Sequence, residues 1–170
     1  MSEHISFYEK IGITPLINAS ETYTNLGGSL MDERTVEAMR QAGEHFVDYP
    51  LLLKKVSQRA AELTNNESAF VTTGAAGGVI LSAAAAICGP DEKKLDQLPH
   101  VENFEKNEIL MFDGKFREII PYWKLTGLTG AKIVSVEPTV EAMVNAVNEK
   151  TAAVFLFPAT LYEEGIPTCE

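Results

Sequence analysis

The segment from Val71 to Gly78 has the residue types that could form an anion-binding turn. Its sequence, Val-Thr-Thr-Gly-Ala-Ala-Gly-Gly, joins a short apolar run to the start of a small-residue helix. The first N–H groups of a helix have no partner within the helix and carry partial positive charge. Gly74, Ala75 and Ala76 would leave room for a phosphate at these groups, and the Thr73 hydroxyl could cap the helix or donate a hydrogen bond.

Two interpretations of this turn stay open on the pattern alone. One is a phosphate-binding turn. The other, which is the commoner, is a tight strand-to-helix turn whose Ala and Gly residues serve close packing. The segment lacks the lysine of a Walker A loop and the spacing GxGxxG, so the pattern gives little support for an ATP or dinucleotide site.

Residues Asp113–Arg117 form a second candidate site, because they follow an expected strand and ligands in open α/β sheets bind beyond the carboxyl ends of strands. Phe116 could stack on an aromatic cofactor, and Lys115 or Arg117 could bind an anionic group. The alternative is a solvated turn with Phe116 packed in the core. The loop Tyr23–Ser29 could border a site, although a structural loop is its more ordinary interpretation.

The cysteines and histidines show no metal-binding spacing. They form no CxxC pair and lie far apart in the chain, at Cys88, Cys169, His4, His45 and His100. No metal site is therefore expected, and the cysteines are expected to be free thiols in a reducing cytoplasm. His45 is expected to be a structural or surface residue rather than a catalyst.

The hydrophobic pattern predicts that strands and helices alternate from Ala69 onward, which is typical of an α/β fold. Strands are expected at Ala69–Thr72, Ile109–Phe112, Lys132–Val136 and Ala152–Phe157. Helices are expected after the N-cap residue Asp32, at Leu51–Leu63, at Ala75–Cys88, from Pro121 to Thr126 and after Pro138. The second of these is expected to stop at Thr64–Asn66. The last is expected to place Val140, Met143, Val144 and Val147 on one face. The polar stretch Asp91–Glu108 is expected to be a surface connection with one short turn around Leu95 and Leu98.

Composition narrows the class of protein. The chain has 170 residues, 45% of them hydrophobic and 22% charged, which fits a folded globular domain. The net charge of −10 argues against a nucleic-acid partner, because phosphate neutralisation by basic residues supplies most of that affinity. The longest near-apolar stretch, Ala75–Gly89, is too short for a membrane span, and no signal peptide opens the chain. A cytoplasmic protein is therefore expected.

Several segments, in order along the chain, resemble the selenocysteine-synthase-like (SelA-like) pyridoxal-phosphate enzymes. The matching segments are Ile13–Ser20, Thr22–Met31, His45–Asp48, Val71–Gly77, Lys106–Ile109 and Lys150–Val154. The resemblance implies the three-layer αβα fold of the aspartate aminotransferase type. It assigns residues 1–30 to an N-terminal arm and ordered loop, and residues 31–170 to the N-terminal half of the cofactor-binding large domain.

The resemblance also implies the cofactor and its binding residues. Thr73, Gly74, Ala75 and Ala76 fall on the loop that binds the phosphate of pyridoxal 5'-phosphate. Phe116 takes the place near the strand end where such enzymes carry a ring-stacking histidine. The lysine that forms the Schiff base is expected beyond residue 170, and no lysine of this chain matches its motif, so the catalytic residues stay unknown.

The implied function is that of a transferase or ammonia-lyase acting on a small molecule that bears an amino group. The intact enzyme is expected to be a homo-oligomer without a tRNA partner, and the isolated chain to be inactive and either unstable or self-associating. The alternative is a non-catalytic interaction or regulatory module that pairs with a C-terminal half or with a full-length relative.

Overall fold

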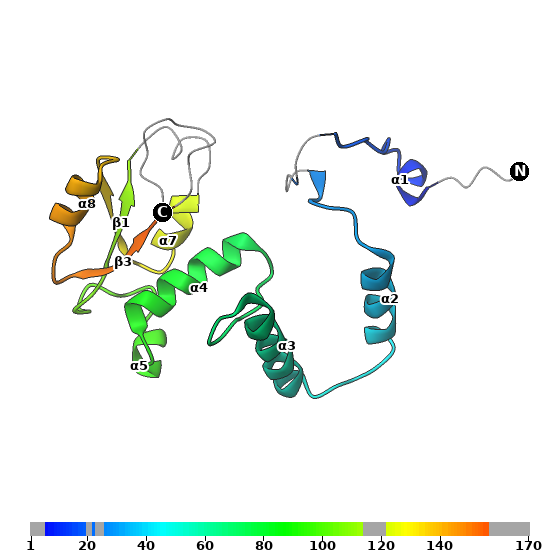
Figure 1. The fold of residues 1–170 in the computed structure, drawn as a ribbon, viewed down its shortest axis with the longest axis horizontal. Helices are drawn as coiled ribbons and strands as arrows, with labels where there is room; N and C mark the ends of the chain where they lie inside the picture. The colour runs from blue at the N-terminus through cyan, green and yellow to red at the C-terminus, as the bar shows by residue number, and fades with distance from the viewer. Residues whose placement is uncertain (1–5, 20–21, 23–25, 114–121, 157–170) are drawn as a thin grey trace, which may run out of the picture. The chain divides into compact units, whose positions relative to one another are not determined.

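The computed structural model describes residues 6–19, 22, 26–113 and 122–156 (Figure 1). The chain divides into two units, Met1–Leu53 and Lys54–Glu170, and each is described by itself. The first unit spans the boundary expected at residue 30, so the division into an arm and a large-domain half stays a prediction.

In the described residues of the first unit, the helices have capped N-termini and form no core. Helix α1 (Phe7–Lys10) starts with a capping box, in which Ser6 and Glu9 each accept a hydrogen bond from the other's backbone N–H. Helix α2 (Glu33–Ala42) begins after Asp32, whose side chain accepts a hydrogen bond of 2.9 Å from the N–H of Arg34, as predicted. None of the described residues before Lys54 is buried.

Helix α3 (Tyr49–Thr64) crosses the division between the units and begins and ends at polar residues. The side chain of Asp48 accepts a hydrogen bond of 2.9 Å from the N–H of Leu51. At the other end, Asn65 has a positive φ of 53° and the N–H of Asn66 bonds the carbonyl of Ala61 at 3.0 Å. The predicted stop at Thr64–Asn66 is therefore confirmed.

A parallel sheet of the order β2-β1-β3 forms the centre of the second unit. Its strands are β1 (Glu108–Phe112), β2 (Lys132–Val136) and β3 (Thr151–Phe155), which confirms three of the predicted strands. The register pairs Leu110 with Val134 on one side and with Val154 on the other.

The prediction of a strand at Ala69–Thr72 is wrong for the described part of the chain, where this segment is irregular and pairs with no strand. Phe70 and Val71 are 65% and 55% exposed. A short apolar run shows that a segment could be buried, but it does not show whether a partner strand lies beside it.

Helices lie on both faces of this sheet, as the α/β prediction required (Figure 1). Side chains of β1 alternate between the faces: Ile109 and Met111 pack with α4 (Ala75–Cys88), whereas Leu110 packs with Met143 of α8 (Val140–Ala146). Helix α4 has the predicted bounds. Its small residues allow it to approach the sheet and α7 (Tyr122–Gly127) closely.

Two details of the predicted helices and connections need correction. Helix α8 begins at Val140 after the N-cap Thr139, which agrees with the expected start after Pro138. It buries Met143, however, whereas Val140, Val144 and Val147 are more than half exposed. The reason is that Ala142 and Ala146 pack beside Met143, so the helix is rotated relative to the valine stripe.

The connection Asp91–Glu108 is not wholly at the surface. It contains the short helix α5 (Glu92–Leu95), capped by Asp91, and it buries Val101 and Phe104 against α4 and β1. In the described residues, no helix has both the length and the apolar character needed to cross a membrane.

Candidate functional site

The turn before α4 has the open geometry that an anion would need. Gly74 precedes the helix with φ 133° and ψ 174°, and no side chain caps the first turn. The positive φ is one that glycine adopts at little cost. Ala75 and Ala76 are exposed. In the described part of the chain, the N–H groups of Ala75, Ala76 and Gly77 donate to no acceptor, so three donors of the first turn have no partner.

Thr73 does not cap the helix, so that part of the prediction is wrong. An ideal Cβ placed on Gly77 would lie 3.4 Å from the Thr73 hydroxyl oxygen, which puts this side chain beside the first turn of α4. The hydroxyl therefore lies beside Gly77 and makes no capping hydrogen bond to the helix.

Thr72 is a residue of the turn that the sequence did not single out. Its hydroxyl donates a hydrogen bond of 2.8 Å to the carbonyl of Gly74. An ideal Cβ on Gly78 would lie 3.6 Å from the same hydroxyl oxygen, so the missing side chains of Gly77 and Gly78 make the space that both threonines use. A threonine two residues before a glycine cap is the signal that could have identified it.

The structure brings four of the five predicted cofactor-binding residues into one turn: Thr73, Gly74, Ala75 and Ala76. Phe116, with Lys115 and Arg117, lies outside the described residues, so its stacking role stays a prediction. Asp113 is described and exposed at the carboxyl end of β1, where its N–H bonds the carbonyl of Val136 at 2.6 Å. The loop residues Leu26–Ser29 are described and unburied.

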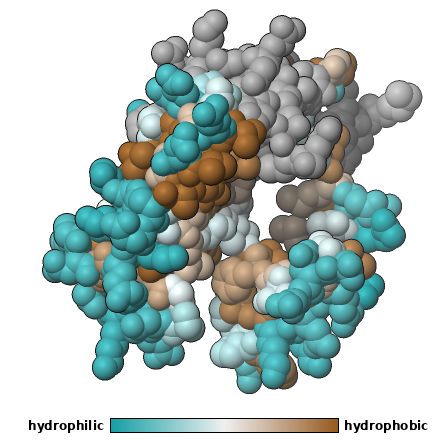
Figure 2. Space-filling view, turned by 60° about the vertical axis from the view of Figure 1, so that its left-hand side comes forward, coloured by the Kyte–Doolittle hydropathy of each residue, from teal (hydrophilic) through white to brown (hydrophobic). Residues whose placement is uncertain are grey.

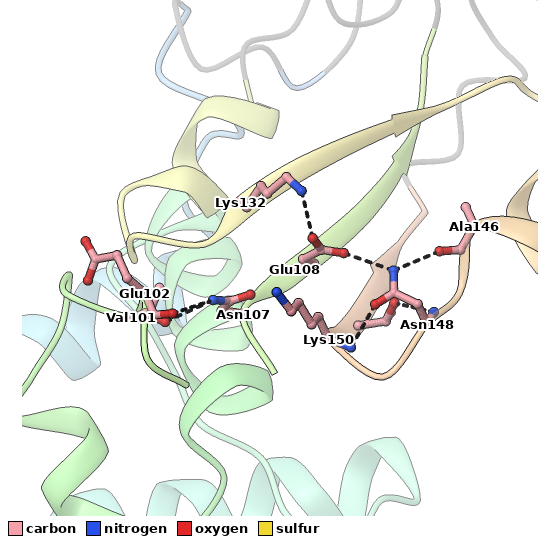
Figure 3. Close-up of polar contacts among 9 residues, drawn as sticks. Val101, Glu102, Asn107, Glu108, Lys132, Ala146, Asn148 and Lys150 are labelled. Atoms are coloured by element: carbon pink, nitrogen blue, oxygen red, sulfur yellow. Dashed lines mark hydrogen bonds and ion pairs between the residues drawn. The ribbon is translucent and has the colours of Figure 1, made fainter. Parts of the chain in front are cut away.

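A second polar cluster lies at the other edge of the sheet, where the strands begin (Figure 3). Glu108 Oε1 lies 2.8 Å from Lys132 Nζ, and Glu108 Oε2 accepts a hydrogen bond of 3.0 Å from Asn148 Nδ2. The backbone N–H of Lys150 bonds Asn148 Oδ1 at 2.8 Å. The Glu108 side chain is 8% exposed, whereas that of Lys132 is 70% exposed.

These contacts keep Glu108 ionised. The hydrogen bond from Lys132, followed by that from Asn148, lowers the pKa of the Glu108 carboxyl below its ordinary value, and the opposing effect of burial is smaller. Ligands of parallel sheets bind at the carboxyl edge, whereas this cluster lies at the amino edge. We therefore assign it a structural role, in which it holds the starts of the three strands together. The sequence showed only a glutamate at the end of a polar connection.

Among the described residues, no group of His, Cys, Asp and Glu could hold a metal ion. Cys88 is a buried free thiol on the sheet-facing side of α4, and its burial raises its pKa. The ring of His45 is exposed, with Nδ1 3.0 Å from the carbonyl of Gln41.

Two curated enzymes are similar to this chain, whereas no protein-family model matches it. One is the 5'-C-glycyluridine monooxygenase-decarboxylase of a Streptomyces species, 29% identical over 176 aligned positions that cover 98% of this chain and 44% of the relative. The other is the D-glucosaminate-6-phosphate ammonia lyase of Salmonella typhimurium, 29% identical over 153 positions that cover 87% of this chain and 41% of the relative.

A solved structure supports the same relationship. The structure of D-glucosaminate-6-phosphate ammonia-lyase matches with a TM-score of 0.80 and 28% identity, over 88% of this chain and 42% of that chain. The chain thus spans less than half the length of the relatives it matches. It is homologous to one part of an ammonia lyase and of a monooxygenase-decarboxylase, and it has the fold of that part.

Proposed function

We propose that this chain is the N-terminal, cofactor-phosphate-binding portion of a SelA-like enzyme that uses pyridoxal 5'-phosphate. The reaction we favour is that of an ammonia-lyase or transferase acting on a small molecule with an amino group. Similarity to an ammonia lyase over 87% of the chain supports the reaction class. The observation that carries the proposal is the set of free N–H groups in the first turn of α4.

The residues present fit a phosphate group. A phosphate needs several donors and a positive field, and the N–H groups of Ala75, Ala76 and Gly77 supply both at the start of a 14-residue helix. The methyl groups of the two alanines and the bare Gly74 leave the approach to these donors open. Thr73 would add a hydroxyl donor from beside the same turn.

The chain's own residues would bind and orient the cofactor. When bound, pyridoxal phosphate supplies an electron sink for the substrate's reacting carbon. The turn before α4 would fix the phosphate, and Phe116 would cover the ring in place of a histidine. We expect the Schiff-base lysine outside these residues, so the chain alone should bind the cofactor weakly and catalyse little.

Apolar surface favours a second candidate function, in which the chain associates with another protein. Figure 2 shows hydrophobic patches at the surface beside strongly hydrophilic side chains. The exposed apolar residues of the second unit include Phe70, Leu81, Leu128 and Val144, all at least 48% exposed. Such a module would pair with a C-terminal half or a full-length relative. It would leave the backbone N–H signals of α4 unchanged when pyridoxal phosphate is added.

The decisive experiment follows the backbone N–H signals of residues 75–77 by nuclear magnetic resonance while pyridoxal phosphate is added. We expect these signals to shift with the phosphate form and not with pyridoxal. Ala75→Pro removes one N–H at a helix position that tolerates proline, and Ala75→Gly is the matched control that keeps it. Losing one hydrogen bond to a charged group, about 1.5–3 kcal/mol, should weaken binding roughly 10- to 160-fold.

Two outcomes would contradict the proposal. One is equal affinity of the proline and glycine variants for pyridoxal phosphate, because the N–H of residue 75 would then not be used. The other concerns the lysine: a stable visible absorbance band, fixed by borohydride on a single lysine of this chain, would show that the chain carries its own Schiff-base residue.

A further inference from the structure

We draw no further inference here: the strongest candidate, the exposed apolar face of helix α8 formed by Val140, Val144 and Val147, carries none because nothing in the part of the chain that the structure describes shows what covers it.

Discussion

Replacing Glu108 by glutamine tests whether one buried carboxylate holds the starts of three strands together. Glutamine keeps the size of the side chain but removes its charge. Its amide NH₂ would then face one of the two donors that the carboxylate now accepts from, Lys132 Nζ or Asn148 Nδ2. One hydrogen bond is therefore lost, and the other loses the contribution of the charge.

The size of the effect follows from the exposure of the partners. A hydrogen bond to a charged group stabilises by about 1.5–3 kcal/mol. The Lys132 side chain is 70% exposed, so water replaces much of its contact, and its share is close to the ~0–1 kcal/mol of a surface ion pair. We expect Glu108→Gln to lower the free energy of opening of the sheet by about 2 kcal/mol, which raises the opening equilibrium constant ~30-fold.

Hydrogen exchange of the β1 amides measures this loss directly, because Ile109, Leu110 and Met111 are buried and pair with both neighbouring strands. At neutral pH, Glu108→Gln should lower their protection ~30-fold. Glu105→Gln removes the same charge from an exposed side chain nearby and is the matched control. If the two variants lower the protection equally, the cluster does not join the strands.

The pH dependence has a definite sign. The pKa of Glu108 is lower in the folded chain than its ordinary value, so its contribution to stability is fully present at pH values above the ordinary pKa of about 4.3. That contribution is lost as the pH falls through the folded pKa. The difference in protection between the natural chain and Glu108→Gln should therefore be constant near pH 7 and shrink below about pH 4.

Three further predictions concern the second unit. Gly130→Ala would place its Cβ against the carbonyl oxygen of Pro99 at a φ of +86°, so it should lower the free energy of unfolding measured in urea by about 2–4 kcal/mol. Gly127→Ala, whose Cβ would lie 3.9 Å from Ile133 Cγ1, should change that free energy little. Cys88 is buried with a raised pKa, so iodoacetamide should label its peptide slowly until urea unfolds the chain, and rapid labelling of the folded chain would contradict its burial. Leu110→Ala should lower the free energy of unfolding by ~2–5 kcal/mol because the side chain is fully buried. Leu128 is exposed, and a decrease for Leu110→Ala no larger than that for Leu128→Ala would show that Leu110 is not in the core.

Local chemistry in the sequence predicted the elements whose ends are set by neighbouring residues. Asp32 is a strong start signal and Thr64–Asn66 is a strong stop signal, and α2 begins and α3 ends beside them. The turn at residues 73–76 was identified for the same reason, since small residues at a helix start have a direct physical meaning.

Features that depend on which helices and strands pack together could not be predicted from neighbouring residues in the sequence. The Glu108 cluster exists because β2 and β3 both pair with β1, and its residues lie 24 and 40 positions apart in the chain. The rotation of α8, which buries Met143 in place of the valine stripe, depends on how its alanines pack on the sheet. The strand expected at Ala69–Thr72 failed because an apolar run does not specify its neighbour.

The order of the strands in the sheet also bears on how the chain is made. The central strand β1 is synthesised first, and both of its partners, β2 and β3, follow it. Until residues 132–136 leave the ribosome, β1 has neither β2 nor β3 beside it, and Glu108 has neither Lys132 nor Asn148 as a partner. The nascent chain therefore passes through a stage in which β1 lacks both of the strands that pair with it in the described sheet, and unpaired strand edges are prone to aggregation.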